Sequence, residues 1–344
     1  MQRDVLQKGI NLGGWISQFK EHAPHHFDTF ITREDIIRIK RWGFDHVRLP
    51  VDYELLEEKG HPGRYTGCGF DYIDRCLGWC DKAGLRVILD LHKAPGYAFD
   101  EQEQNDLEEN PEKQERFTAL WLEMSRRFSS VDQDLLAFEL LNEIVFNDEK
   151  KWNDILKTTI LAIRSIDENR MILFGGNYYS SVDTLIDLPE FTDENILPKF
   201  HFYLPLSVTH QKAYWVPSLL EFDREVEYPG KADGLGEYLS GNPEHAWRFS
   251  DEVDADFNKM YLRKRLGPAI KFMGERKTSV HCGEFGVIDR APLRTRMNWT
   301  SDMVEILRDL GIGYAYWTYK AMDFGLVDFD GIVVNRELIN ILAG

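Results

Sequence analysis

Eight strand-like apolar runs recur along this chain of 344 residues, and a helical pattern follows most of them. Strands that alternate with helices indicate βα units, which build a parallel sheet covered by helices. Eight units predict a closed (β/α)8 TIM barrel of the α/β class. An open nucleotide-binding sheet would also need a glycine-rich phosphate loop, and no GxGxxG pattern follows the early runs. The predicted strands are residues 8–13, 46–51, 85–92, 135–143, 171–176, 197–203, 279–286 and 313–319.

Helix signals lie between these runs. Thr32 with Asp35 resembles a capping box at the start of one amphipathic segment, and Gly43 predicts the end of that helix. Apolar residues at helical spacing before Gly84 predict a second helix. Further helices are predicted over residues 112–128, 151–167, 299–310 and 337–342.

One interval departs from the regular βα repeat. Roughly 75 residues separate Tyr203 from Ser279, about twice the usual spacing, which predicts an insertion. We expect residues 205–262 to form a subdomain between strand 6 and helix 6, on the face where the βα loops emerge. The remaining chain has no linker or repeat, so residues 1–344 are expected to be one catalytic barrel.

Composition narrows the class of partner. The formal net charge of −17 at pH 7 disfavours nucleic acid and anionic membranes, because both bind basic surfaces. It agrees with an uncharged substrate. Aromatic residues make up 13% of the chain, so some are candidates for stacking on sugar rings, while most are expected in the core and at its rim.

The four cysteines do not form a disulfide scaffold in a chain of this length. Cys76 and Cys80 lie four residues apart on a predicted helix, but no His/Cys cluster with zinc-like spacing accompanies them. We expect them to be core thiols, and we expect neither a metal nor another cofactor.

Two glutamates occupy matching positions at the ends of buried strands. The run LLAFELLNE ends at Glu143, and SVHCGEFG contains Glu284 between two glycines. A carboxylate at the carboxyl end of a barrel strand is where such enzymes place their chemistry. Either glutamate alone could simply begin a polar loop, but the matched pair favours paired-carboxylate catalysis.

Other polar residues also follow the predicted strands. Taken singly, Arg48 could pair with a core carboxylate, a histidine could be hydrogen-bonded in place, and Trp317 could pack in the barrel. The barrel brings the strand ends together, so the set as a whole predicts a site. Its members are Arg48, His92, Asn142, Glu143, His201, Tyr203, Glu284 and Trp317.

Seven sequence blocks occur in order along the chain: GINLGGWI at 9–16, GFDHVRLP at 43–50, LDLHKAPG at 89–96, AFELLNE at 137–143, FHFY at 200–203, GEFG at 283–286 and YWTY at 316–319. Together they resemble glycoside hydrolase family 5, the cellulase family A, within the clan of retaining barrel glycosidases. The resemblance covers essentially the whole chain. Residues 201–215, 228–230 and 281–287 are also similar to the clostridial endoglucanase C type, which has a subdomain inserted after strand six.

The resemblance implies a role for each matching residue. Glu143 would be the general acid/base and Glu284 the nucleophile. Asn142 would bind the sugar 2-hydroxyl, and Arg48 and Tyr203 would keep Glu284 ionised and oriented. The remaining matches would bind substrate: His92 and His201 would line the site, and Trp317 would form the floor of one subsite.

The resemblance also implies a reaction, the internal cleavage of β-1,4-glucan and of mixed-linkage β-glucan. One departure concerns Lys93, where the endoglucanase C type tends to have a second histidine after the one at His92. This departure keeps β-mannanase and exo-β-1,3-glucanase open as alternatives. A catalytically silent carbohydrate-binding protein is the alternative of another class, and it should have lost one of the two glutamates.

The expected partner is therefore a β-glucan polysaccharide or oligosaccharide, bound by a monomer. Within the expected insertion, Trp215 and His210 are candidate sugar contacts. A polymeric substrate favours secretion, but no apolar run reaches transmembrane length and the start of the chain has no signal-peptide apolar segment. A trimmed chain would look the same, so the compartment stays open.

Overall fold

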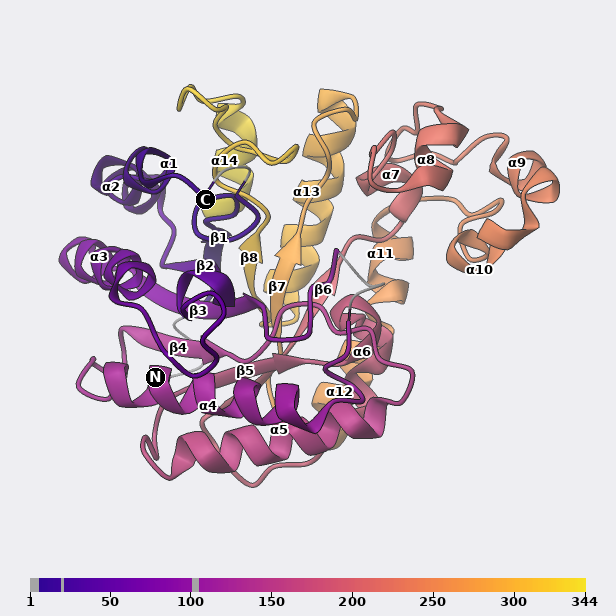
Figure 1. The fold of residues 1–344 in the computed structure, drawn as a ribbon. Coiled ribbons are helices and arrows are strands. Elements are labelled where there is room, and N and C mark those ends of the chain that lie inside the picture. The colour runs from indigo at the N-terminus through magenta and orange to yellow at the C-terminus, as the bar shows by residue number, and fades with distance from the viewer. Residues whose placement is uncertain (1–5, 20–21, 101–104) are drawn as a thin grey trace.

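Eight parallel strands close into a barrel in chain order in the computed structural model, which describes residues 6–19, 22–100 and 105–344 (Figure 1). The barrel closes where β1 pairs with β8, with Gly9 opposite Ala315. The predicted fold class is therefore confirmed. The signal-peptide prediction rests partly on residues 1–5, which lie outside the described residues. The strands are β1 Lys8–Asn11, β2 His46–Asp52, β3 Arg86–Lys93, β4 Leu136–Glu139, β5 Ile172–Gly175, β6 Ile196–Phe202, β7 His281–Phe285 and β8 Gly313–Tyr316.

The strand β4 ends four residues before the predicted end at Glu143. The extended path nevertheless continues, because Leu140 donates its amide proton to Leu173 and Asn142 donates to Leu91. These alternating contacts to β5 and β3 carry the chain to the rim of the barrel. Glu143 therefore still lies at the carboxyl end of the strand, as predicted.

Helices cover the outside of the barrel (Figure 1). The predicted capping box of Thr32 and Asp35 is present, and Gly43 ends that helix with φ of 108°, a value that favours glycine. The long helices are α2 Arg33–Trp42, α3 Gly67–Ala83, α4 Pro111–Phe128, α5 Glu149–Arg164, α12 Gly267–Arg276, α13 Leu293–Asp309 and α14 Arg336–Ala343. Shorter ones are α1 Pro24–Thr29, η2 Tyr53–Leu55, α6 Asn177–Ser180 and η4 Val182–Asp187.

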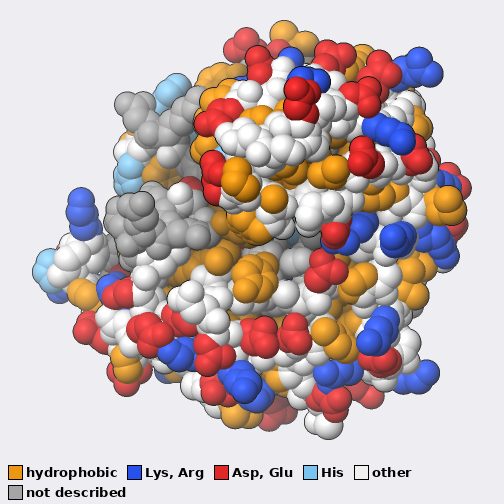
Figure 2. All heavy atoms as spheres, turned by 90° about the vertical axis from the view of Figure 1, so that its right-hand side faces the viewer, with side chains coloured by type: hydrophobic (Ala, Val, Ile, Leu, Met, Phe, Trp, Pro, Cys, Tyr) orange, Lys and Arg blue, Asp and Glu red, His pale blue; other side chains and the backbone are white. Residues whose placement is uncertain are grey.

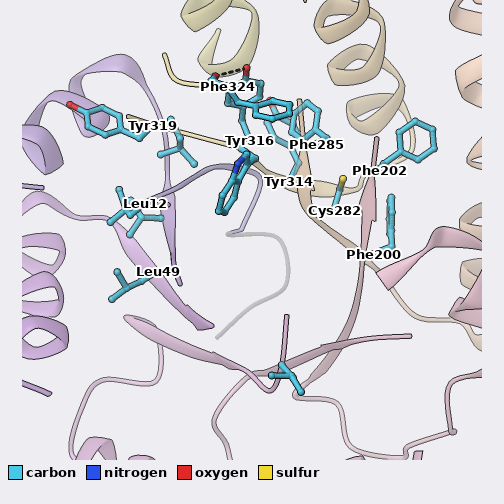
Figure 3. Close-up of a cluster of buried hydrophobic side chains, with 14 of the residues drawn as sticks. Leu12, Leu49, Phe200, Phe202, Cys282, Phe285, Tyr314, Tyr316, Tyr319 and Phe324 are labelled. Carbon is cyan, nitrogen blue, oxygen red and sulfur yellow. Dashed lines mark hydrogen bonds between the residues drawn. The ribbon is translucent and has the colours of Figure 1, made fainter. Parts of the chain in front are cut away.

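Alternation along the strands separates the outer core from the barrel interior. In β6, Phe200 and Phe202 belong to the outer core (Figure 3). Phe202 stacks there on Trp299 of α13. Lys199 and His201, which alternate with these two residues, belong to the polar site described below. A separate buried apolar cluster forms a layer inside the barrel, made of Leu6, Ile88, Ala137, Met171, Leu173 and Leu197.

The interval between β6 and β7 contains several short helices that extend to one side of the barrel in Figure 1. They are α7 Leu206–Thr209, α8 Pro217–Phe222, α9 Leu235–Gly241, η5 Pro243–His245, α10 Ala246–Phe249 and α11 Lys259–Arg265. That residues 205–262 form a subdomain of their own stays a prediction. The expected core thiols Cys76 and Cys80 are buried in α3.

The surface seen in Figure 2 mixes acidic and basic side chains, with hydrophobic side chains gathered between them near the middle of the view. Among the described residues, each helix is too short or too polar to cross a membrane.

Candidate active site

The two predicted catalytic glutamates meet at the carboxyl end of the barrel. One carboxylate oxygen of Glu143, one of Glu284 and a ring nitrogen of His201 all lie within 4.8 Å of one another. Small fractions of the two carboxylate side chains are exposed, 13% for Glu143 and 7% for Glu284. The barrel has therefore brought together two strand ends that are far apart in the sequence.

Arg48 of β2 organises the groups beneath this pair. Its Nη1 donates to Glu284 Oε1 at 2.7 Å and to Asn11 Oδ1 at 2.9 Å. Its Nη2 donates to Asn142 Oδ1 at 2.8 Å, and the guanidinium makes two bonds to Glu139, at 2.8 and 2.7 Å. A planar guanidinium with five donors suits such a multiple contact. Arg48 thereby fixes both Glu284 and the residue that precedes Glu143.

Glu284 receives a hydrogen bond at each carboxylate oxygen. Arg48 reaches Oε1, and the Tyr203 hydroxyl donates to Oε2 at 2.9 Å. Burial and the negative charge of Glu284 raise the pKa of Tyr203 well above its usual range, so the phenol keeps its proton. The two donors hold Glu284 in one orientation.

Glu143 has a different environment. Nδ1 of His201 lies 2.7 Å from Glu143 Oε1. Burial raises the pKa of Glu143 well above its usual range, and the charge of Glu284 raises it further. Both effects favour the protonated form of Glu143, as a general acid requires. Two carboxyls with such different surroundings can serve as an acid and a nucleophile.

His92 and Trp317 form a stacked pair beside the carboxylates, with ring centroids 5.8 Å apart and an interplanar angle of 4°. Nδ1 of His92 lies 2.6 Å from Asp90, and burial lowers the pKa of His92 to about 3. Its ring is thus neutral and held in place. Lys93 forms an ion pair with Asp100 at 2.8 Å.

A layer of buried charged groups lies under the predicted site. The sequence patterns described above did not predict it. Asp90 lies 3.0 Å from Arg48, and Lys199 lies 3.0 Å from Glu139. Burial alone would raise the pKa of Glu139, but the charges of Arg48 and Lys199 outweigh it and bring the value to about 2. A sequence signal was available, because Asp90 and Lys199 stand two residues before His92 and His201, on the same face of their strands.

The two candidate sugar contacts between β6 and β7 pack against the site through their aromatic rings. His210 lies against Tyr203, with ring centroids 4.9 Å apart, and Trp215 lies against His210 at 6.0 Å. Trp215 is 42% exposed. These contacts place both residues beside the groups that surround Glu284, and their contact with a sugar stays a prediction.

The fold and the site together define an α/β barrel with paired carboxylates at the carboxyl ends of its strands, the arrangement of barrel glycosidases. The model of the family described as Cellulase (glycosyl hydrolase family 5) matches residues 7–323. The chain belongs to glycosyl hydrolase family 5, and it is a glycoside hydrolase.

Relatives and solved structures agree with this assignment. Endoglucanase C of Acetivibrio thermocellus is 44% identical over 338 residues, covering 98% of each chain. Cel5A of Thermotoga maritima in complex with cellobiose superposes with a TM-score of 0.80 at 26% identity, covering 99% of this chain and 98% of that one. Its complex with mannotriose gives the same TM-score, identity and coverage.

Proposed function

We propose that this enzyme cleaves β-1,4-glucan internally with retention of configuration, and that mixed-linkage β-glucan is a second substrate. The observation that carries the mechanism is the close approach of Glu143 and Glu284, with one oxygen of each within 4.8 Å. Retaining glycosidases place their carboxyl groups about 5–5.5 Å apart, whereas inverting ones leave about 6.5–9.5 Å for a water molecule. The similarity to an endoglucanase over nearly the whole chain supports the substrate.

In the first step, Glu284 attacks the anomeric carbon while Glu143 gives its proton to the leaving glycosidic oxygen. The glycosyl–Glu284 ester that forms carries no charge on the carboxyl group. The repulsion that raised the pKa of Glu143 is then removed, so Glu143 becomes a base. It takes a proton from the water that hydrolyses the ester, and both carboxyls return to their starting states.

The remaining site residues serve these two steps. Arg48 and Tyr203 hold Glu284, and Asn142, fixed by Arg48, is placed to bind the sugar 2-hydroxyl. Trp317, held in place by its stack on the buried His92, is the surface proposed for the sugar on which the reaction occurs. The enzyme is proposed to act as a monomer and without a cofactor.

A panel of polysaccharides tests the substrate. Reducing-sugar release should be fastest on carboxymethyl cellulose and barley β-glucan, and viscosity should fall early because the cuts are internal. Faster release from laminarin, or release from chain ends without loss of viscosity, would contradict the proposal. Proton NMR of early products should show the β-anomer first, since retention preserves the configuration.

β-Mannan is a second candidate substrate. The Cel5A of similar fold has been solved with mannotriose as well as with cellobiose. Mannan therefore belongs in the panel, and release from it at a rate above that from barley β-glucan would make mannanase the better description.

A further inference from the structure

Lys199 of β6 is a fully buried lysine in direct contact with the machinery of the acid/base. Its Nζ lies 2.8 Å from the Asn142 carbonyl oxygen, 2.8 Å from Ser180 Oγ and 3.0 Å from Glu139 Oε1. It also lies 3.1 Å from Nε2 of His201. An ammonium has three protons to donate, and these four acceptors are more than enough to engage all three.

The neighbouring strands leave room for this contact. A Cβ at Gly175 of β5 would come within 3.0 Å of the Lys199 side chain and within 2.4 Å of Ser180 Oγ. A Cβ at Gly283 of β7 would lie 3.1 Å from His201 Nε2. Glycines on both sides of β6 therefore make space where Lys199 and His201 meet.

The contact determines which nitrogen of His201 carries the proton. An ammonium can only donate, so Nε2 must accept and cannot carry a hydrogen. Burial and the charge of Lys199 lower the pKa of His201 well below its usual range, so the ring is neutral. In a neutral ring the single proton then resides on Nδ1, the nitrogen 2.7 Å from Glu143 Oε1.

We propose that Lys199 is a positioning residue of the acid/base, which acts by fixing the tautomer of His201. His201 Nδ1–H donates to Glu143 Oε1, and this leaves the acid's own proton on Oε2, the oxygen that delivers it to the leaving group. The inference rests on the proposed roles of Glu143 and Glu284 and adds a residue to them.

A purely structural role is the rival interpretation. Lys199 also balances the charge of Glu139, and loss of either partner of a buried ion pair destabilises a protein. Such a role would reduce the folded fraction and would affect every substrate equally. A positioning role affects proton delivery, so it depends on how much help the leaving group needs.

The first test is the protonation of His201 in the unaltered enzyme. In enzyme labelled with ¹⁵N at histidine, NMR should show His201 protonated at Nδ1 and bare at Nε2 at pH 7. The signals are assigned by their loss in the His201→Gln variant. A proton on Nε2, or on both nitrogens, would overturn the proposal, and this result requires neither a lysine variant nor a known substrate.

The second test compares leaving groups in Lys199→Met. The kcat/KM for an unactivated cello-oligosaccharide should fall about 30-fold, while that for dinitrophenyl β-cellobioside should fall less than about 3-fold, because a good leaving group departs with little proton assistance. In the same variant the His201 proton should move to Nε2. Equal losses on both substrates would identify a structural lysine.

A matched control is Lys320→Met, which removes another buried ammonium, one that donates to the Phe30 carbonyl oxygen at 3.0 Å. It should change both kcat/KM values by the same small factor. If cello-oligosaccharides prove not to be substrates, the proposed function fails, and the comparison is repeated with the glycan that is cleaved and its dinitrophenyl glycoside.

Discussion

The barrel interior contains buried histidines at both ends, and their surroundings differ. At the carboxyl end, His92 and His201 each place Nδ1 within 2.7 Å of a carboxylate oxygen. At the amino end, the rings of His46 and His281 lie 5.3 Å apart. There, within the described part of the chain, His46 Nε2 and both nitrogens of His281 have no hydrogen-bond partner.

We infer from this difference that the histidines at the carboxyl end take part in catalysis, whereas those at the amino end are packing residues. Charges at the carboxyl end fix the protonation and direction of each ring, as a catalytic network requires. At the amino end, burial lowers the pKa of His281 well below its usual range, and the nearby His46 lowers it further. His46 Nδ1 lies 2.5 Å from Asp45 Oδ1, but within the described residues a proton on His281 would meet no hydrogen-bond partner, so its effect should be on stability.

The largest expected effect is at the carboxyl end. Glu284→Ala should lower activity at least about 10⁴-fold on every substrate, including activated aryl glycosides, because the attacking group is lost. The thermal midpoint should fall only modestly, because Arg48 loses one buried partner but keeps its ion pairs with Asp90 and Glu139. Steady-state kinetics with melting curves measures both, and retained turnover of an aryl glycoside would contradict the role.

The loss of activity in Glu143→Ala should depend on the substrate. Polysaccharide hydrolysis should fall about 10²- to 10⁴-fold, the usual contribution of a general acid. A dinitrophenyl glycoside should still undergo the first step and release a burst of the phenol, after which the second step is slow because the base is missing. Pre-steady-state absorbance records the burst. A missing burst together with a slow first step would make Glu143 the nucleophile and Glu284 the acid/base.

The amino end should show the opposite behaviour, a change of stability without a change of chemistry. The folded-state pKa of His281 lies below its unfolded value of about 6.5, so the unfolded state binds more protons as the pH falls below that value. Stability is therefore lost below about pH 6.5, by up to ~1.4 kcal/mol per pH unit for one group. His281→Leu should reduce this loss between pH 7 and 5 and leave kcat near that of the parent.

Thermal melts over that pH range measure the effect, and the exposed His25→Leu serves as the control that should not move it. Part of the acid loss should remain in His281→Leu, because His92 and His201 also have lowered pKa values. An unchanged pH dependence would show that His281 does not contribute to the loss of stability in acid.

A smaller effect is expected outside the barrel. Trp215→Ala should raise KM for polymeric β-glucan several-fold, with little change in the thermal midpoint, because the side chain is 42% exposed. The buried Trp299→Ala is the contrast, with an expected loss of about 3–5 kcal/mol of stability. A large fall in the midpoint of Trp215→Ala with normal kinetics would make Trp215 a packing residue.

The smallest expected effect is that of a chelator. Glu143, His201 and Glu284 could together hold a metal ion, yet the proposed mechanism needs only the two carboxyls. Dialysis against a chelator should leave activity unchanged. Activity that disappears and returns only with an added divalent ion would replace the acid/base mechanism by a metal-assisted one.

Much of this arrangement could be predicted from the sequence. The apolar runs located the strands, because buried parallel strands have continuous apolar sequences. Local signals such as the capping box at Thr32 and the glycine at Gly43 located helix ends, because they depend on neighbouring residues alone. Glu143 and Glu284 could be predicted from their positions at the carboxyl ends of strands, since any barrel brings such positions together.

The contacts under the site could not be predicted in this way. That Lys199 of β6 meets Glu139 of β4 depends on the register of both strands against β5. No local pattern encodes that register. The charged residues themselves were visible inside apolar runs, and alternation would have assigned them to the barrel interior.

The contacts of Arg48 also bear on how the enzyme folds. Its partners Asn11, Glu139 and Glu284 come from β1, β4 and β7, and the last is 236 residues away along the chain. Contacts of such long range form only after the intervening chain has been ordered. During refolding, activity should therefore return later than helical circular dichroism, and it reports the joining of the first and last thirds of the chain.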